Sequence, residues 1–222
     1  MKEPVKNPDP IPYPSVGWPA SDPLVTGVGG TYLCTNANDG LSVDSVSPPS
    51  ICQNNPGVRE VGWIDSGGGY SILFSRPVFQ NTLPAGSIFV GSSVGAPGPN
   101  TNMRGVPDIA YQASSRTGVL IFLNGSWFII GGTSAGSPQW AGLAADADQL
   151  GRHRMGNINA ALYSIAQARS QYAVAMHDIT TGNNDVAEIG GGFNAGPRWD
   201  PVTGLGTPNA AHLLPLLVAR TS

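Results

Sequence analysis

The stretch IIGGTSAGSPQWAGLAADADQLG, residues 129–151, joins an apolar run to a sequence whose apolar residues recur at helical spacing. Gly131 and Gly132 lie between the two parts and free the backbone for a tight turn. The pattern predicts a strand, a glycine corner and a helix over roughly 137–150. Ser134 then lies at the corner, just where the helix begins.

Ser134 has two interpretations at this position. The first peptide N–H groups of a helix are unpaired, and the helix dipole favours negative charge beside them. Thr133 or Ser134 can use that position simply to cap the helix. Alternatively, Ser134 is a nucleophile whose neighbouring amides stabilise an oxyanion. The corner alone leaves both open.

Composition limits the class of protein. The chain has 222 residues, of which 41% are hydrophobic and only 11% are charged. That apolar content indicates a folded core, while Gly 30 and Pro 20 indicate many turns. A net charge of −3 without a basic run argues against a nucleic-acid partner. No run of eighteen apolar residues and no signal-peptide pattern is present, so no membrane partner is expected.

Local patterns favour an α/β domain with a hairpin. In VLIFLNGSWFII, residues 119–130, two β-rich apolar runs flank Asn-Gly, which suits a two-residue hairpin turn. The segment 22–33 is expected to be a strand that ends in a glycine turn. Further helices are expected at roughly 157–169 and 208–219, the last capped by Thr207 with Pro208 in its first position.

Cys34 and Cys52 are the only cysteines, and they flank a polar loop. A disulfide between them would stabilise the fold by about 3 kcal/mol in the chain-entropy model and would imply an oxidising compartment. Two unrelated free thiols are the alternative.

Several motifs together resemble one family. GGTSAGSPQWAG around Ser134 is similar to the serine motif of the sedolisin family, the serine-carboxyl peptidases, and subtilisins have a related motif. Further stretches distinguish the two families and follow in the sedolisin order from about residue 16 to 218. They are GWPASDPLVTGVGGTYL (17–33), EVGWIDSGGGYSILFSRPVFQ (60–80), RGVPDIAYQA (104–113), HDITTGNND (177–185) and FNAGPRWDPVTGLGTP (193–208).

The resemblance implies roles for two residues. Ser134 would be the nucleophile, activated by a glutamate that an aspartate holds, in place of the histidine of other triads. Asp108 falls on the family's oxyanion-hole aspartate, and it must be protonated to donate a hydrogen bond there. Both features imply an endopeptidase that hydrolyses peptide bonds at acidic pH. The alternative for Asp108 is a turn residue after Pro107.

The resemblance also implies one calcium site near the C-terminus. Calcium prefers carboxylate and carbonyl oxygens. The family usually has glycine where Arg198 stands, and an arginine there is expected to strain the loop or weaken the site. A metal-free turn is the alternative. The implied carboxylate ligands are Asp178 and Asp200, and the implied main-chain ligands are Ile179, Gly196 and Arg198.

The family's base and its partner, a Glu-x-x-x-Asp pair on one helix, are not found in this sequence. The glutamates are Glu3, Glu60 and Glu188, and the fourth residue after each is never aspartate. His177 can be imagined in a Ser134–His177–Asp triad, but it falls inside the calcium-like motif. His153 and His212 are expected at a helix end and in the last helix.

Three hypotheses follow from these motifs. The chain is the C-terminal portion of a sedolisin-like peptidase, inactive alone, whose Glu/Asp pair an N-terminal fragment supplies. Alternatively it is a catalytically inactive sedolisin-like fragment that binds or assembles, or a subtilisin-like Ser/His/Asp peptidase fragment. A peptide or protein is the expected substrate, and an extracellular location is expected.

The resemblance implies an incomplete subtilisin-like α/β fold, with a parallel sheet flanked by helices. Residues 1–15 are expected to form an extended tail or cut end, and residues 16–222 the C-terminal portion of the peptidase domain.

Overall fold

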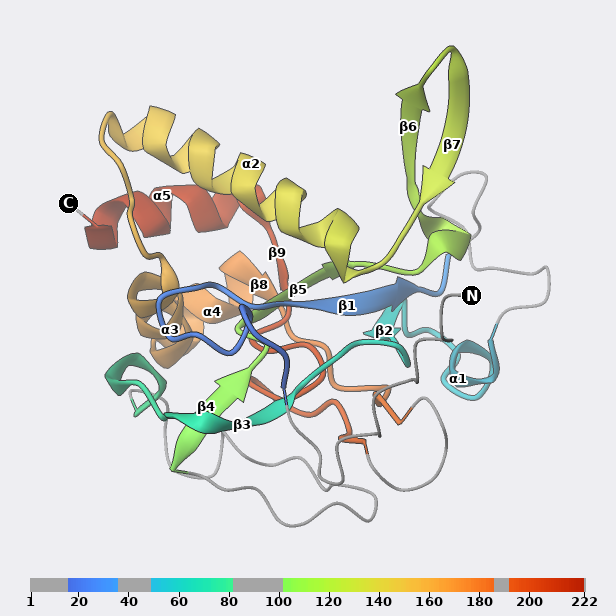
Figure 1. Cartoon of the computed structure of the whole chain (residues 1–222), viewed down its shortest axis with the longest axis horizontal. Helices are drawn as coiled ribbons and strands as arrows, with labels where there is room; N and C mark the ends of the chain where they lie inside the picture. Colours follow the sequence, from blue (N-terminus) through green and yellow to red (C-terminus); the bar gives the residue numbers. More distant parts are fainter. Residues whose placement is uncertain (1–15, 36–48, 82–101, 186–191, 222) are drawn as a thin grey trace, which may run out of the picture.

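The computed structural model describes residues 16–35, 49–81, 102–185 and 192–221. The tail expected over 1–15 therefore lies outside the described residues. A three-stranded sheet of order β2-β1-β5 lies at the centre (Figure 1). Its strands are β1 (Val28–Leu33), β2 (Glu60–Gly62) and β5 (Ile109–Gln112). β1 pairs with β5 in parallel and with β2 in antiparallel, so the expected α/β class with a parallel strand pair is confirmed.

Three antiparallel two-stranded ladders surround this sheet. β3 (Gly69–Ser75) pairs with β4 (Met103–Val106), and β6 (Val119–Leu123) pairs with β7 (Ser126–Ile130). β8 (Met176–His177) pairs with β9 (Thr207–Pro208). The helices are α1 (Ser50–Gln53), α2 (Thr133–Gly151), α3 (Asn159–Gln167), α4 (Arg169–Ala175) and α5 (Ala210–Thr221). Single 3₁₀ turns occur at Val78–Asn81 and Ser115–Thr117. In the described residues no helix is both long and apolar enough to span a bilayer.

Helix α2 packs directly on the parallel strand pair, with α5 beside it (Figure 1). The buried Trp140 indole N–H donates to the carbonyl of Ala110 in β5 at 3.0 Å. Gly136 faces the sheet so closely that a Cβ there would lie 2.9 Å from the Cβ of Tyr111 and 3.2 Å from Val28. Glycine at this position therefore lets the start of α2 approach β1 and β5.

Two expected element boundaries are wrong. The last helix begins at Ala210, because Thr207 and Pro208 pair as β9 with β8 instead of capping and opening the helix. The glycines of β1 lie within the strand and do not end it. A Cβ on Gly29 would lie 2.6 Å from the ring of Pro107 and 2.7 Å from the carbonyl oxygen of Val202, so close packing selects glycine here.

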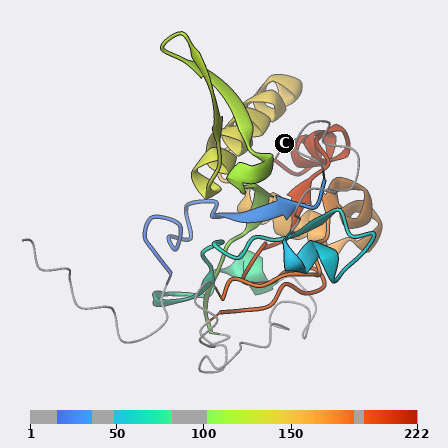
Figure 2. The same ribbon diagram turned by 90° about the vertical axis from the view of Figure 1, so that its right-hand side faces the viewer.

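The predicted hairpin is confirmed. Leu123 of β6 pairs with Ser126 of β7, and the two turn residues have positive φ, 50° at Asn124 and 79° at Gly125. Both views show the hairpin standing away from the rest of the fold (Figures 1 and 2). Its apolar side chains are exposed, with Trp127 at 68% and Leu120 at 63%.

Cys34 and Cys52 form a disulfide, which resolves the choice between a bridge and two free thiols in favour of the bridge. The bond joins the end of β1 to α1 across a sequence separation of 18. Val61 and Tyr32 pack with the two cysteines in a small second core.

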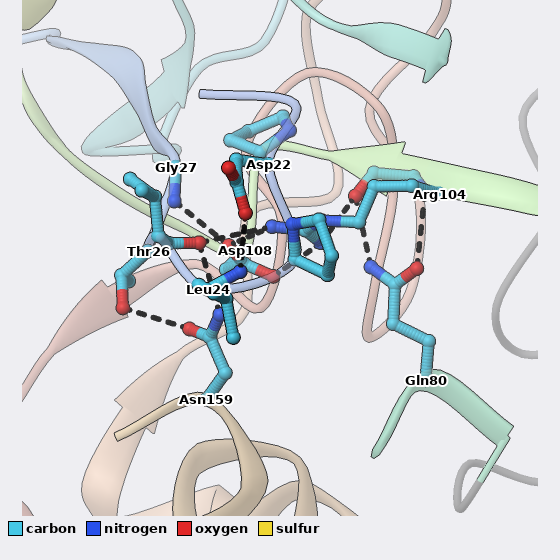
Figure 3. Close-up of polar contacts among 12 residues, drawn as sticks. Asp22, Leu24, Thr26, Gly27, Gln80, Arg104, Asp108 and Asn159 are labelled. Carbon is cyan, nitrogen blue, oxygen red and sulfur yellow. Dashed lines mark hydrogen bonds and ion pairs between the residues drawn. The ribbon is translucent and has the colours of Figure 1, made fainter. Parts of the chain in front are cut away.

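A buried ion pair holds the start of β5 in place (Figure 3). The Asp108 carboxylate accepts from Arg104 Nη1 at 2.8 Å and from Arg104 Nη2 at 2.6 Å, and both side chains are fully buried. Asp108 also accepts from the backbone N–H of Gly27 at 2.7 Å and from the Tyr163 hydroxyl at 3.1 Å. Burial by itself lowers the pKa of Arg104, but the hydrogen bonds and charge of Asp108 outweigh it, and the pKa lies above its ordinary value.

Replacement of the aspartate tests the contribution of this pair. Asp108→Asn leaves the Arg104 guanidinium buried without a counter-charge, so we expect the free energy of unfolding to fall by about 3–5 kcal/mol. Urea denaturation measures the change. Asp146→Asn, at an exposed position of α2, is the control and should shift stability by less than about 0.5 kcal/mol. A loss in Asp108→Asn as small as the control's would contradict the assignment.

Buried tyrosine predicts a loss of stability at alkaline pH. Burial, followed by the charge of Asp108, raises the pKa of Tyr163 well above its ordinary value. Above about pH 10 the unfolded chain releases this proton while the native chain keeps it. The native state then binds more protons, so the free energy of unfolding falls as pH rises. Urea denaturation from neutral to alkaline pH measures the slope, which Tyr163→Phe should make shallower; an unchanged slope would contradict the prediction.

Candidate functional site

The backbone before Ser134 is shaped by two glycines. Gly132 has φ 90°, a conformation that glycine adopts readily, and its N–H donates to the carbonyl of Ala113 just after β5. A Cβ on Gly131 would lie 2.5 Å from the backbone nitrogen of Ser115. The chain therefore turns tightly against the C-terminal end of β5 before α2 begins.

Ser134 itself is exposed in the first turn of α2. The N-cap residue is Gly132, and no side chain caps the helix, so the structure does not support the interpretation of Thr133 or Ser134 as a cap. The hydroxyl of Ser134 lies at the positive end of a 19-residue helix, where developing negative charge is stabilised. This arrangement suits a nucleophile, which must reach a substrate from solvent.

The structure does not bring Asp108 to Ser134. Asp108 comes before the first residue of β5, whereas the Ser134 corner is hydrogen-bonded to Ala113 after its last residue. Five steps along extended backbone separate Asp108 from Ala113 by roughly 16 Å. Asp108 is also fully buried and accepts from Arg104. These contacts disagree with the expected oxyanion role and indicate a structural one.

The histidines likewise lie apart from Ser134 in the described residues. His177, in β8, has its Nδ1 2.7 Å from Glu60 Oε2. Glu60 in turn accepts from the Thr31 hydroxyl at 2.6 Å and the Thr207 hydroxyl at 3.0 Å. The Glu60 hydrogen bond comes first among the causes that raise the pKa of His177. This dyad links β2 to β8 and β9, so His177 has a partner other than Ser134.

The remaining histidines also have positions away from the serine. His153 follows the end of α2, with its Nδ1 3.3 Å from the Arg154 carbonyl oxygen, and His212 is exposed on α5. Nothing in the described residues therefore forms the Ser/His/Asp arrangement of a subtilisin-like peptidase.

Each of the two expected calcium carboxylates accepts hydrogen bonds from the segment 196–203. Asp178 accepts from the backbone N–H of Arg198 at 2.8 and 2.9 Å. Asp200 accepts from the backbone N–H groups of Gly196, Val202 and Thr203 at 3.2, 2.7 and 2.8 Å, and from the Thr203 hydroxyl at 2.9 Å. Ile179 is buried beside Asp178. These contacts place Asp178 beside Arg198 and Asp200 beside Gly196.

Arg198 occupies a conformation that suits glycine. Its φ is 71°, in the left-handed region, as expected at a position where the family usually has glycine. Its guanidinium donates to the carbonyl of Ala166 at the end of α3 and lies over the Tyr172 ring at 5.8 Å. The positive charge is thus directed to the C-terminal end of a helix.

The carboxylate oxygens near residues 196–203 are of the type that hard cations prefer. Asp200 is fully buried, and burial raises its pKa to about 7 despite four hydrogen-bond donors. A buried carboxylate of this kind is stabilised by a cation, and its oxygens suit calcium. The described part of the chain contains no group of three or more His, Cys, Asp or Glu side chains that could hold a metal ion. A calcium ion here would therefore also need main-chain oxygens as ligands.

The sequence reasoning missed Arg104 and Glu60. Arg104 lies four residues before Asp108, and this pairing of opposite charges within RGVPD was the available signal. In the sequence, Glu60 stands out only because the fourth residue after it is not aspartate. Its partners Thr31 and Thr207 come from strands that are distant in sequence. No local pattern identifies such partners.

Comparisons with known proteins agree with the motifs. No family model matches the chain. It is 37% identical over 201 residues to sedolisin of Pseudomonas sp. (strain 101), covering 90% of this chain and 30% of that protein. It is 34% identical over 210 residues to kumamolisin of Bacillus sp. (strain MN-32), covering 93% of this chain and 33% of the relative. Human tripeptidyl-peptidase 1 is 33% identical over 212 residues, with 90% of this chain and 33% of the relative covered.

A solved structure shares the fold. Pseudomonas sedolisin, a serine-carboxyl proteinase complexed with two molecules of pseudo-iodotyrostatin, aligns with a TM-score of 0.67 and 30% identity. The alignment covers 95% of this chain and 52% of that chain. The chain spans about a third of the length of the curated relatives it matches. With its serine motif, its α/β fold and this similarity over nearly its whole length, the chain belongs to the sedolisin family and corresponds to part of the family's domain.

Proposed function

We propose that this chain is the serine-bearing part of a sedolisin-type endopeptidase, which hydrolyses peptide bonds at acidic pH with Ser134 as the nucleophile. One observation carries the proposal: Ser134 is exposed at a glycine corner, at the positive end of α2, inside the motif that resembles the family's serine motif. The family's relatives are peptidases, which supports a peptide or protein as substrate.

The base for Ser134 comes from outside this sequence. A serine hydroxyl needs a neighbouring base to become a strong nucleophile. A Glu-x-x-x-Asp pair does not occur in the chain, and His177 is engaged with Glu60. We therefore propose that a segment carrying the Glu/Asp pair completes the site. The missing base is also the reason to retain a catalytically inactive binding or assembly protein as the second candidate.

Stabilisation of the oxyanion is assigned to the start of α2. The first backbone N–H groups of a helix and its dipole both favour negative charge. Because Asp108 lies at the opposite end of β5 and pairs with Arg104, it takes no part in this step. Its contribution is to hold β5, against which the Ser134 corner turns.

Calcium is proposed as the cofactor of the 178–200 loop. Asp178 and Asp200 would provide carboxylate oxygens, with main-chain oxygens from Ile179, Gly196 and Arg198. The ion would supply the positive charge that buried Asp200 requires, and would tie β8 to the loop that precedes β9. The Cys34–Cys52 disulfide supports an extracellular location for the same protein.

Complementation tests the role of Ser134. The chain alone should not cleave a fluorogenic peptide between pH 3 and 7, because its sequence contains no Glu-x-x-x-Asp pair to activate the hydroxyl. Addition of the Glu-x-x-x-Asp portion of a sedolisin-like catalytic domain should give turnover at acidic pH. Ser134→Ala should reduce that turnover by at least about 1000-fold.

Ser137→Ala is the matched control, since Ser137 is exposed in the same part of α2 and should be dispensable. Turnover that survives Ser134→Ala would exclude the proposed nucleophile. Serine-dependent turnover by the chain alone would show that a different base is present, and complementation without any turnover would favour the inactive candidate.

Calcium removal tests the cofactor. An ion present at a hundredfold excess over its dissociation constant stabilises the native state by about 2.7 kcal/mol. A chelator should therefore lower the melting temperature of the chain, and added calcium should restore it. Asp200→Asn should abolish this response, while the exposed Asp146→Asn should retain it. An equal response in Asp200→Asn, or none in the unaltered chain, would contradict the proposed site.

A further inference from the structure

The β6–β7 hairpin, which stands away from the rest of the fold (Figures 1 and 2), has one face made only of apolar side chains. Directly opposite residues of an antiparallel pair share a face, as do residues two apart on one strand. Leu120 pairs with Ile129 and Phe122 pairs with Trp127, so all four lie on the same face. Each of them is at least 60% exposed. These four residues are called the hairpin face below.

The hairpin face is continuous and has no charge beside it on the ribbon. Residues 119–130 contain no Asp, Glu, Lys, Arg or His. The rings of Phe122 and Trp127 lie 5.2 Å apart, so the two aromatic side chains form one surface. In the described residues no further strand pairs with the outer edge of β6 or of β7. A contiguous exposed apolar surface of this kind typically marks a site of protein–protein contact.

The base of the hairpin is packed closely against its neighbours. A Cβ on Gly118 would lie 2.2 Å from the carbonyl oxygen of Ile130, and a Cβ on Gly131 would lie 2.5 Å from the backbone nitrogen of Ser115. These close approaches fix the direction in which the hairpin leaves the fold, relative to the start of α2.

Ser134 lies a short way along the chain from the hairpin face. Ile130 ends β7, Gly131 and Gly132 form the corner, and Ser134 follows in the first turn of α2. The five residue steps from Ile129 to Ser134 span at most about 18 Å. A base acts on the serine hydroxyl only within hydrogen-bond distance of it. A polypeptide that supplies the base therefore lies beside the corner, within reach of the hairpin face.

Two observations identify what covers this face. The alignment with Pseudomonas sedolisin covers 52% of that chain, so a partner that corresponds to the remainder is large enough to contact hairpin and corner together. Four large apolar side chains present on the order of 500 Å² of surface, against about 800 Å² for each partner in a stable complex. The hairpin face alone is therefore too small for a stable dimer, whereas a partner that also contacts the corner gains the additional area.

We propose that the hairpin face is the docking surface for the polypeptide that carries the Glu/Asp pair. The inference rests on the proposed function and adds the place at which this partner binds. The partner's contacting surface is apolar, because a charge buried against the hairpin would find no counter-charge on residues 119–130. Docking beside α2 then holds the base close to Ser134.

Co-purification tests the docking surface without turnover. The part of Pseudomonas sedolisin that does not align with this chain is co-expressed, with an affinity tag, together with this chain carrying Ser134→Ala, which prevents cleavage. The two should purify as a complex. Trp127→Lys and Phe122→Lys should each lower the yield of co-purified chain at least about tenfold, because large aromatic side chains dominate binding at apolar interfaces.

Val78→Lys is the matched control, since Val78 is an apolar residue that is 81% exposed on a 3₁₀ turn outside the hairpin. Its yield of complex should equal that of the unaltered hairpin. Circular dichroism checks that each variant is folded. Absence of a complex, or an equal yield in Trp127→Lys and Val78→Lys, would overturn the proposal.

Hydrogen exchange gives a second measurement that needs no substitution. Amides of β6 and β7 should exchange more slowly in the complex than in the chain alone, because the partner covers the ribbon. Unchanged exchange over residues 119–130 would overturn the proposal even if the lysine variants do not fold.

Light scattering of the chain alone distinguishes a second copy from the proposed partner. The chain should remain monomeric at the concentration that gives the complex. A dimer that Trp127→Lys abolishes, together with undiminished binding of the sedolisin part, would assign the hairpin face to a second copy and overturn the proposal.

The complemented enzyme with Ser134 restored separates this inference from the proposed function. Cleavage that depends on Ser134 but is unchanged in Trp127→Lys would remove the docking surface and leave the nucleophile. A complex that depends on Trp127 but shows no Ser134-dependent cleavage would retain the docking surface and favour the inactive candidate.

Discussion

The ion pair between Arg104 and Asp108 is the constraint on which the arrangement of the central strands depends. It lies wholly in the interior and joins β4 to the residue that precedes β5, and Asp108 also accepts from the backbone N–H of Gly27 just before β1. Tyr163 attaches α3 to the same carboxylate, and Gln80 contacts both Tyr163 and Gly105. Because loss of one partner leaves a buried charge, the pair permits little variation in how these elements meet. The Ser134 corner turns against the backbone that follows the other end of β5.

Close backbone approach is the second constraint, and it explains the glycines at the contact between α2 and the central sheet and within β1. Gly136 brings α2 onto Tyr111 and Val28, and Gly30 leaves space for the rings and methyl groups that gather beside the serine. Neither position has positive φ, so the requirement is for space and not for an unusual conformation. Gly132 differs, since its φ of 90° is needed for the turn itself. The position of Ser134 therefore depends on glycines that leave room for close contacts, as well as on the side chains that make those contacts.

Features governed by neighbouring residues were predictable from the sequence. The hairpin at Asn124-Gly125 and the long helix after the glycine corner follow from turn chemistry and periodicity, and both are present. The ion pair of Asp108 with Arg104 was not predicted, because it and the position of Asp108 before the start of β5 depend on tertiary structure. The start of the last helix was misplaced for a related reason, since pairing with β8 overrides the helix signals of Thr207 and Pro208. The approach of Trp63 and Thr133 to Gly30 arises only when β1, β2 and β5 assemble.

The β6–β7 hairpin has a practical consequence for the chain in solution. It presents aromatic and aliphatic side chains on a two-stranded ribbon whose outer edges carry no further strand in the described residues. Ribbons of this kind associate with one another through edges and apolar faces. The net charge of −3 provides little mutual repulsion to oppose such contacts. Colloidal stability of the purified chain is therefore governed by a segment that contributes nothing to its core, and dilute, low-salt conditions are those that keep it dispersed.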